Sequence, residues 1–244
     1  MQKGIFKFKH FEVSHQRSSM KIGVDAVLIG AWASAGGSKI LDVGTGCGVI
    51  ALMMAQREPD AEISAIDIDA PSVEEAAENF RISPWRERLR SNLMSFEELL
   101  HLPGRFDLII SNPPYFDAGV KVLDDSRKKA RHVGKLSPET LVKGAGMILE
   151  PGGCLAMIVT SEYVARIGAV CNESGMTISR LQYVRNHREA PVKRVMLELV
   201  KMDNGSSDRP ENEPSEMNIL TMFESDGLPT EEYRELCGDF YLQF

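Results

Sequence analysis

The segment FDLIISNPPY, residues 106–115, contains the side chains whose types and order indicate chemistry most directly. Its apolar run predicts a buried strand that ends at Asn112, and the two prolines that follow restrict the backbone. The side-chain oxygen of Asn112 and the carbonyl of Pro113 would each accept one hydrogen of an amino group. An amino group on a planar ring or amide is a weak nucleophile, because its lone pair is delocalised. Holding both hydrogens turns that lone pair toward an electrophile, so catalysis consists mostly of positioning.

The residues that we expect to form the catalytic site are Asn112, Pro113, Pro114 and Tyr115. The ring of Tyr115 would stack on a planar base that has left its own stack. The alternative is a Pro-Pro turn after a core strand, with an incidental aromatic residue. A glycine-rich segment upstream favours the catalytic interpretation, because a simple turn would not require it.

That glycine-rich segment, GTGCG, directly follows an expected strand and precedes an expected helix. Its glycines are Gly44, Gly46 and Gly48. Glycine permits a tight turn and the close approach of a ligand, although the third glycine of the dinucleotide-binding motif is missing. Asp42 would repel a pyrophosphate but suits the amino group of S-adenosylmethionine, and Asp67 would accept hydrogen bonds from ribose hydroxyls. Together these residues favour S-adenosylmethionine over NAD; a structural turn with a capping aspartate is the alternative.

Strands and helices alternate along the chain, and this pattern must position both motifs. The expected strands are 39–43, 62–67, one near 89, one ending at 112, 153–160, 178–184 and 192–200, and the expected helices are 49–57, 71–80 and 162–173. Such alternation predicts an α/β fold with a doubly wound, mostly parallel, Rossmann-like sheet of seven strands that closes with an antiparallel C-terminal hairpin. Ligands bind at the carboxyl ends of such strands.

The length of 244 residues predicts one main domain spanning 1–244. Within it, 1–35 would be an accessory segment with a half-exposed strand at 3–13 and an apolar helical stretch at 20–37. Residues 203–216 would form a flexible loop. The extension 217–244 would add a strand at 218–223 and a short helix near Tyr233.

Composition and charge limit the possible functions. No apolar run reaches the roughly 20 residues of a membrane span, and no signal peptide is evident, so we expect a cytoplasmic protein. The four cysteines and five histidines lack metal-ligand spacing, and no metal site is predicted. The net charge of -7 arises in residues 203–244, where eleven acidic residues outnumber two basic ones. The preceding part has 26 basic and 24 acidic residues, which leaves room for a nucleic-acid partner.

Three basic clusters are candidates for contact with RNA phosphates. The cluster after the catalytic motif comprises Arg127, Lys128, Lys129, Arg131 and His132, in SRKKARH. Lys7 and Lys9, interleaved with aromatic residues, form a second, although a strand with one core face explains them almost as well. The weakest candidate lies within residues 185–194. Charged runs are usually solvated faces, so position beside the catalytic motif is the only argument for the first cluster.

The chain resembles the bacterial tRNA adenine-N6 methyltransferases that modify adenosine 37 of valine tRNA, a branch of the class I S-adenosylmethionine-dependent methyltransferases. The matching segments are FKFKHFEV, MKIGVDAVLIGAWA, ILDVGTGCGVIALMMAQ, NFRISPW, FDLIISNPPYF, ARH at 130–132 and DFYL at 239–242. The motif NPPY alone is shared with enzymes that act on release-factor glutamine, ribosomal RNA guanine or DNA adenine. The first and last segments narrow the resemblance to the tRNA branch.

The resemblance implies N6-methylation of adenosine 37 in a tRNA, S-adenosylmethionine as cofactor and tRNA as partner, with a monomer as the default state. Ser95, with Glu97 nearby, stands where the family tends to have an acidic residue that contacts the cofactor adenine, and Val24 stands in place of a threonine. We include Ser95 among the expected cofactor-binding residues. The alternatives are an rRNA guanine-N2 or release-factor glutamine-N5 methyltransferase, a catalytically silent RNA-binding protein and a nicotinamide oxidoreductase.

Overall fold

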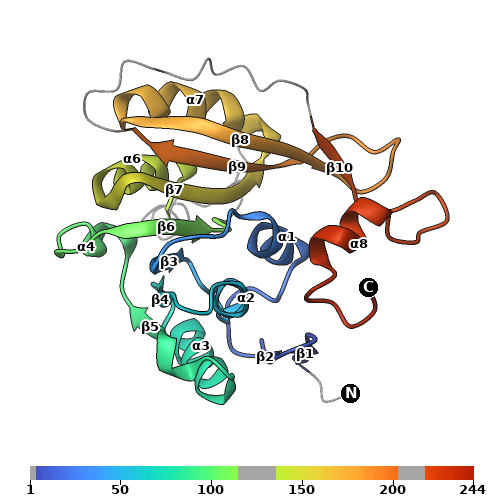
Figure 1. Cartoon of the computed structure of the whole chain (residues 1–244), viewed down its shortest axis with the longest axis horizontal. Helices are drawn as coiled ribbons and strands as arrows, with labels where there is room; N and C mark the ends of the chain where they lie inside the picture. Colours follow the sequence, from blue (N-terminus) through green and yellow to red (C-terminus); the bar gives the residue numbers. More distant parts are fainter. Residues whose placement is uncertain (1–3, 115–135, 203–217) are drawn as a thin grey trace, which may run out of the picture.

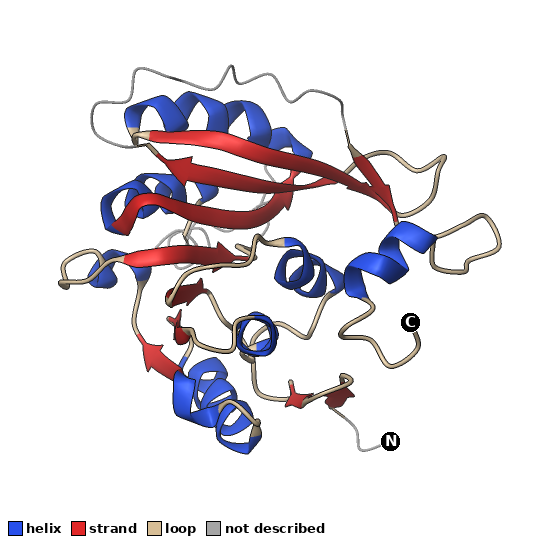
Figure 2. Cartoon of the chain, viewed as in Figure 1, coloured by secondary structure: helices blue, strands red, loops and turns tan. Residues whose placement is uncertain are grey.

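An eight-stranded sheet forms the centre of the computed structural model, which describes residues 4–114, 136–202 and 218–244 (Figures 1 and 2). Its strand order is β10-β8-β9-β7-β6-β3-β4-β5. The strands are β3 (Lys39–Val43), β4 (Glu62–Asp67), β5 (Leu89–Leu93), β6 (Phe106–Ser111), β7 (Leu149–Thr160), β8 (Met176–Arg185), β9 (Arg194–Lys201) and β10 (Ile219–Thr221).

The strand directions confirm the doubly wound, mostly parallel class. Strands β5, β4, β3, β6 and β7 are parallel neighbours, and β9 runs antiparallel to both β7 and β8. The expected number of seven strands is one too few, because the three-residue strand β10 joins the edge of the sheet parallel to β8. The C-terminal extension therefore completes the sheet itself.

Helices cover both faces of the sheet because side chains along each strand alternate between two hydrophobic clusters. In β3, Ile40 faces the cluster that contains α1 (Val24–Trp32), α2 (Val49–Arg57), and part of α3 (Ala70–Ile82). The neighbouring Leu41 belongs to the cluster on the opposite face. That face is covered by α6 (Pro138–Ile148) and α7 (Val164–Glu173), with the short α4 (Phe96–Leu99) beside them. The remaining short helices are η1 (Arg86–Arg88), η2 (Ser161–Tyr163) and α8 (Glu231–Cys237).

The N-terminal and C-terminal segments pack against each other beside the sheet. The expected accessory strand is a hairpin of β1 (Ile5–Lys7) and β2 (Glu12–Ser14). Phe8 forms an isolated bridge with Tyr241, and the Lys9 amide donates to the Phe240 carbonyl at 2.9 Å. Phe8 and Phe240 are both buried. The aromatic residues of the first segment therefore contribute to the core.

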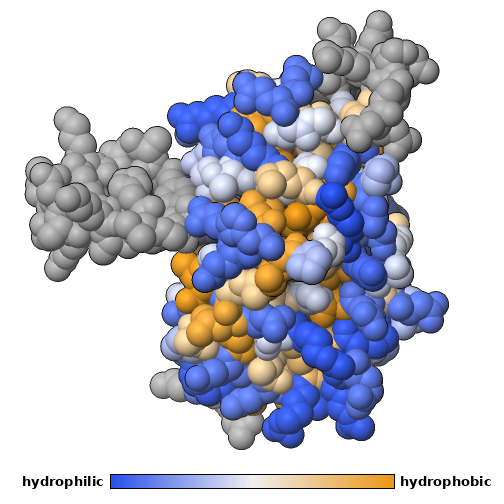
Figure 3. Space-filling view, turned by 90° about the vertical axis from the view of Figure 1, so that its left-hand side faces the viewer, coloured by the Kyte–Doolittle hydropathy of each residue, from blue (hydrophilic) through white to orange (hydrophobic). Residues whose placement is uncertain are grey.

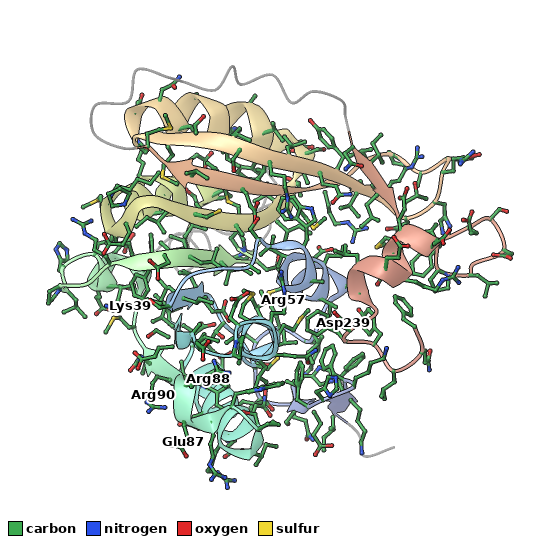
Figure 4. The ribbon with its side chains drawn as sticks, in the orientation of Figure 1. Lys39, Arg57, Glu87, Arg88, Arg90 and Asp239 are labelled. Atoms are coloured by element: carbon green, nitrogen blue, oxygen red, sulfur yellow. The ribbon has the colours of Figure 1, made fainter. Side chains whose placement is uncertain are left out.

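Two half-buried arginines, Arg57 and Arg88, fix the C-terminal end of α2. Arg57 donates to the carbonyl of Gly30 at 2.8 Å, and it lies near Asp239 of the C-terminal segment (Figure 4). Arg88, from η1, donates to the carbonyls of Ala55, Glu58 and Ala61 at 2.6–2.8 Å. Ala55 lies in the last turn of α2, and Glu58 and Ala61 follow the helix, so Arg88 binds carbonyls in and just beyond its C-terminal end. Helix α2, which follows the glycine-rich loop, is thus held at its far end.

Candidate active site

A cavity of about 390 Å³ lies at the carboxyl ends of β3, β4, and β6. Its walls bring together three parts of the sequence that were predicted to form the site: the glycine loop, the end of β4 and the segment after β6. The lining residues are Ser19, Met20, Val43, Gly44, Gly46, Ile66, Asp67, Ile68, Asp69, Met94, Ser95, Phe96, Glu97, Ser111, Asn112, Pro113, Pro114 and Leu136. The expected position of a ligand in a doubly wound sheet therefore coincides with this cavity.

Two glycines of the loop leave space for a ligand. Gly44 and Gly46 have φ values of 74° and 54°, and an added Cβ at either one would have no neighbouring atom within 4 Å. Their amides point into the protein, because Gly44 donates to the Ile66 carbonyl and Gly46 to the Asp67 carboxylate, both at 2.9 Å. The loop thus presents bare backbone to the cavity while its amides tie it to β4.

The third glycine of the loop serves packing. Gly48, with a φ of 84°, precedes the first residue of α2 and does not line the cavity. An added Cβ would lie 2.5 Å from the ring of Phe80 on α3. Gly48 therefore lets α2 and α3 pack together. It does not line the cavity, and its contact with a cofactor stays a prediction.

Asp67 ends β4 and lines the cavity, as the sequence predicts for a residue that binds ribose hydroxyls. Its carboxylate is held on both sides. One oxygen accepts from the Gly46 amide at 2.9 Å, and the other accepts from the Asp69 amide at 3.0 Å. Each oxygen retains a lone pair for a ligand hydroxyl.

Asp42 lies beneath the glycine loop and is fully buried. Its Oδ2 accepts from the Thr45 hydroxyl at 2.6 Å and from the Ala51 amide at 3.2 Å, while its Oδ1 finds no partner among the residues that the structure describes. Burial raises the pKa of Asp42 to about 7, although the bonds from Thr45 and Ala51 lower it. Asp42 does not line the cavity. It acts on the loop from below, and direct contact with a ligand stays a prediction.

Asn112 stands in the wall of the cavity together with Pro113 and Pro114. Its side-chain Oδ1 is buried and has no hydrogen-bond partner within the described part of the chain. A buried acceptor without a partner is costly and is therefore uncommon in folded proteins. The residue before it, Ser111, donates its hydroxyl to the Val43 carbonyl at 2.7 Å, which fixes β6 against β3 at this point. The fold thus holds an unpaired carbonyl-type acceptor beside the glycine loop.

Ser95 lines the cavity, but its side chain also caps a helix. The hydroxyl and amide of Ser95 both donate to the Glu98 carboxylate, at 2.9 Å and 2.8 Å, and the Glu98 amide donates back to the hydroxyl at 3.1 Å. This capping box positions α4, whose exposed Glu97 also lines the cavity. Which of the two residues contacts a ligand stays a prediction.

The expected RNA-binding residues are only partly described. Lys7 pairs with Glu12 at 3.5 Å on the surface of the hairpin. The Lys9 ammonium donates to the backbone carbonyls of Gly238 and Phe244, the latter at 3.2 Å, so it connects the two terminal segments. Outside the described residues are Tyr115, Arg127, Lys128, Lys129, Arg131 and His132.

Sequence reasoning missed the contribution of the N-terminal segment and of the residues after β4. Ser19, Met20 and Ile68 line the cavity, and Met20 and Ile68 are both 55% exposed. Figure 3, which views the molecule from the side of α4 and β5, shows apolar side chains at the surface in the middle of that face. Large exposed apolar residues next to a cavity are a signal for ligand binding, but only the three-dimensional arrangement reveals them here.

A further question is whether the described residues include a set of metal ligands. No group of three or more His, Cys, Asp or Glu side chains is close enough to hold a metal ion there. Across residues 4–114, 136–202 and 218–244, no helix has the length and hydrophobicity of a membrane span.

The fold and the cavity define a Rossmann-like methyltransferase, and the profile of the methyltransferase small domain matches residues 23–167. A predicted O-methyltransferase from Agrobacterium tumefaciens has a similar fold, with a TM-score of 0.63 over 88% of this chain and 96% of that one, at 21% identity.

Comparison with curated relatives identifies the family within this class of methyltransferases. A tRNA1(Val) (adenine(37)-N6)-methyltransferase from Bacteroides thetaiotaomicron is 35% identical over 99% of both chains. An enzyme of the same name from Parabacteroides distasonis is 37% identical over 98% of both. This chain belongs to the family of the tRNA1(Val) (adenine(37)-N6)-methyltransferases.

Proposed function

We propose that this chain transfers a methyl group from S-adenosylmethionine to the N6 nitrogen of adenosine 37 in a valine tRNA. The observation that carries the proposal is the buried, unpartnered carboxamide oxygen of Asn112, a residue that lines the same cavity as the glycine loop. Family membership supports this substrate, because the curated relatives are named for this activity and the similarity extends over nearly their full length.

The residues of the cavity fit S-adenosylmethionine. When bound, S-adenosylmethionine supplies an electrophilic methyl group on a sulfonium. Gly44 and Gly46 would let it approach the backbone closely, because no side chain and no neighbouring atom fills the space beside them. Asp67 would accept hydrogen bonds from the ribose hydroxyls. The negative charge of Asp42 beneath the loop, when the residue is ionised, would favour a cationic ligand over a pyrophosphate.

Asn112 and Pro113 would bind and orient the target amino group. The Asn112 Oδ1 and the Pro113 carbonyl would each accept one of its hydrogens, which withdraws the lone pair from the ring and directs it at the methyl group. As the new N–C bond forms, the nitrogen becomes more acidic, so a proton can leave to water without a base acting beforehand. The contribution of these residues is therefore positional, and effective molarities of 10⁵ M or more are known for well-oriented groups.

The alternatives differ mainly in the planar group that enters the cavity. Guanine-N2 and glutamine-N5 present the same kind of amino nitrogen, so Asn112 does not discriminate among them. Family membership favours adenine-N6 in tRNA over both. The unpartnered Asn112 oxygen and the open glycine loop disfavour a silent RNA-binding protein, because neither feature would be needed for binding RNA phosphates.

The experiment that tests the function is methylation of valine tRNA transcripts by the purified chain with S-adenosylmethionine. Mass spectrometry of the digested nucleosides should find N6-methyladenosine in the unmodified transcript. A transcript with guanosine at position 37 is the matched control and should remain unmethylated. Equal methylation of both transcripts would contradict position 37, and no N6-methyladenosine in either would contradict the activity.

A further inference from the structure

Helix α3 presents an unusual polar face toward the N-terminal segment. Ser72, Glu75 and Asn79 are spaced three and four residues apart, so they lie on one side of the helix, and all three are buried. A buried carboxylate is rare unless it is fully hydrogen-bonded. Figure 1 shows α3 below the sheet with the N-terminal hairpin beside it.

The carboxylate of Glu75 accepts hydrogen bonds from four residues between the end of β2 and Ser18. Its Oε1 accepts from the Ser14 hydroxyl at 2.8 Å and from the Gln16 amide at 2.7 Å. Its Oε2 accepts from the Ser18 amide at 2.8 Å, and the Arg17 amide lies 3.1–3.2 Å from both oxygens. Burial alone would raise the pKa of Glu75, but these hydrogen bonds lower it to about 2. The carboxylate is therefore charged across the physiological pH range.

Asn79 extends this set of contacts to the glycine loop. Its side-chain oxygen accepts from the Ser14 amide at 2.9 Å, and its Nδ2 donates to the carbonyls of Ser14 and Cys47, both at 2.8 Å. Cys47 belongs to the GTGCG segment. One side chain thus connects the N-terminal segment with the loop that borders the cavity.

Ser72 connects the N-terminal segment with the residues that follow β4. Its hydroxyl accepts from the Ser19 amide at 3.2 Å and donates to the Asp69 carboxylate at 2.6 Å. The Asp69 amide in turn donates to Asp67 at 3.0 Å. The chain of bonds from residues 14–19 therefore ends at the carboxylate that is suited to the ribose, and Ser19, Met20 and Asp69 all line the cavity.

We propose that Glu75 is a positioning residue for the cofactor: its carboxylate anchors residues 14–18 on α3 so that Ser19 and Met20 form a wall of the cofactor cavity. This inference rests on the proposed function, because it takes the ligand of the cavity to be S-adenosylmethionine. Met20 is 55% exposed, so it adds little to the core. The Met20 side chain covers the ligand, and Glu75 fixes the position of the backbone that carries it.

The test measures the binding of S-adenosylhomocysteine, an unreactive product, by titration calorimetry to the full chain. In Glu75→Gln, an amide NH₂ replaces the Oε2 atom that accepts from the amides of Arg17 and Ser18. Two donors then face each other, so these two residues lose their hydrogen bonds to this atom. We expect the dissociation constant to rise about tenfold, together with the KM for S-adenosylmethionine, while the KM for tRNA stays within twofold. A merely structural role would lower the active fraction, and hence kcat, without this change in affinity.

Glu74→Gln is the matched control, because it also removes a carboxylate from α3. Glu74 is 69% exposed and its Nη1–Oε2 distance to Arg17 is 3.7 Å, so the pair contributes little. The dissociation constant of Glu74→Gln for S-adenosylhomocysteine should remain within twofold of that of the unaltered protein. A rise of fivefold or more in Glu75→Gln supports the inference, and a smaller rise overturns it.

A second variant keeps the inference testable if Glu75→Gln does not fold. Met20→Ala removes an exposed side chain from the wall, and a rise of threefold or more in the dissociation constant supports the inference, whereas a smaller one contradicts it. If the unaltered protein fails to bind S-adenosylhomocysteine at all, the proposed cofactor is wrong, and that result is distinct from a failure of the role of Glu75.

Discussion

At the scale of single residues, the site contains two buried oxygens that lack partners among the described residues, one on Asn112 and one on Asp42. Their environments differ. Asn112 lines the cavity, whereas Asp42 is enclosed beneath the glycine loop. An unpaired buried acceptor costs roughly 1–3 kcal/mol. Both positions therefore lower the stability of the folded protein, as is common for residues that serve function.

Asp42 should make the stability of the ligand-free protein depend on pH. Its pKa of about 7 in the folded state lies above the ordinary value of 3.8, so the folded state retains a proton that the unfolded chain releases. Stability from this residue is therefore fully present below about pH 4 and is lost as the pH rises toward 7. We expect Asp42→Asn to remove this loss, which amounts to about 4 kcal/mol between the two limits.

Urea unfolding at pH 5 and pH 8 measures this effect as a difference between variants. The unaltered protein should lose more stability than Asp42→Asn over this interval. Asp60→Asn, which alters an exposed carboxylate outside the cavity, should follow the unaltered protein. The same loss in Asp42→Asn and in the unaltered protein would show that Asp42 does not titrate in this range.

At the scale of elements, the glycine loop between β3 and α2 separates two tasks. Gly44 and Gly46 face open space, whereas Gly48 faces the ring of Phe80 on α3. All three have positive φ, which side chains other than glycine rarely adopt. One short loop therefore both opens the cavity and packs two helices together.

Alanine substitutions should separate these tasks. Gly48→Ala meets Phe80 at 2.5 Å and also strains the backbone, so we expect a loss of about 2–4 kcal/mol in the free energy of unfolding. Gly46→Ala strains the backbone only, by about 1 kcal/mol, but places a methyl group beside the cavity. It should weaken the binding of S-adenosylhomocysteine more than it destabilises the fold. Equal stability losses in urea unfolding would contradict this division.

The central elements were predictable because their signals are local. The strand and helix bounds at Lys39–Val43, Val49–Arg57 and Glu62–Asp67 agree with those expected from apolar periodicity and glycine. Helix α6 was not predicted, although Ser137 caps it and Pro138 begins it, because the charged cluster after the catalytic motif was the only feature interpreted in that region. The extent of α1 was overestimated, since the helix begins only at Val24.

The site was predictable where a residue follows directly from a strand end, as Asp67 and Asn112 do. The depth of Asp42 and the packing role of Gly48 depend on how α2 and α3 settle on the sheet, which no local spacing reveals. Met20 lines the cavity, and the preceding residues Ser18 and Ser19 bind side chains of α3 that are more than fifty residues away in the sequence. The polar face of α3 was the available signal, because a carboxylate on an otherwise inward face calls for a partner.

At the scale of the whole molecule, the two terminal segments pack together and close one side of the fold. The aromatic rings of Phe6, Phe8, Tyr233, Tyr241 and Phe244 contact one another here, with centroid distances of 4.7–6.4 Å. Such pairs contribute beyond their buried area. The sequence left two interpretations of the aromatic and basic start open, RNA contact and a strand with one core face; burial of Phe8 and Phe11 supports the core face, and the RNA contact of Lys7 and Lys9 stays a prediction.

Phe240 tests how much the C-terminal segment contributes to stability. Its side chain is 2% exposed, so Phe240→Ala should lower the free energy of unfolding by about 3–5 kcal/mol. Leu242→Ala is the control, because Leu242 is 59% exposed and its loss should change stability by less than about 1 kcal/mol. Equal effects of both substitutions in urea unfolding would show that the segment does not pack as described.

The central claim is that the Asn112 carboxamide holds the target amine and does not hold the cofactor. Asn112→Ala, with Asn172→Ala on the exposed end of α7 as control, separates the two roles when calorimetry with S-adenosylhomocysteine is combined with single-turnover methylation of valine tRNA. We expect Asn112→Ala to bind S-adenosylhomocysteine within about threefold of the unaltered protein, while its methyl-transfer rate falls by about 100-fold or more. A methyl-transfer rate within tenfold of the unaltered protein, or a loss of affinity as large as the loss of rate, would contradict it.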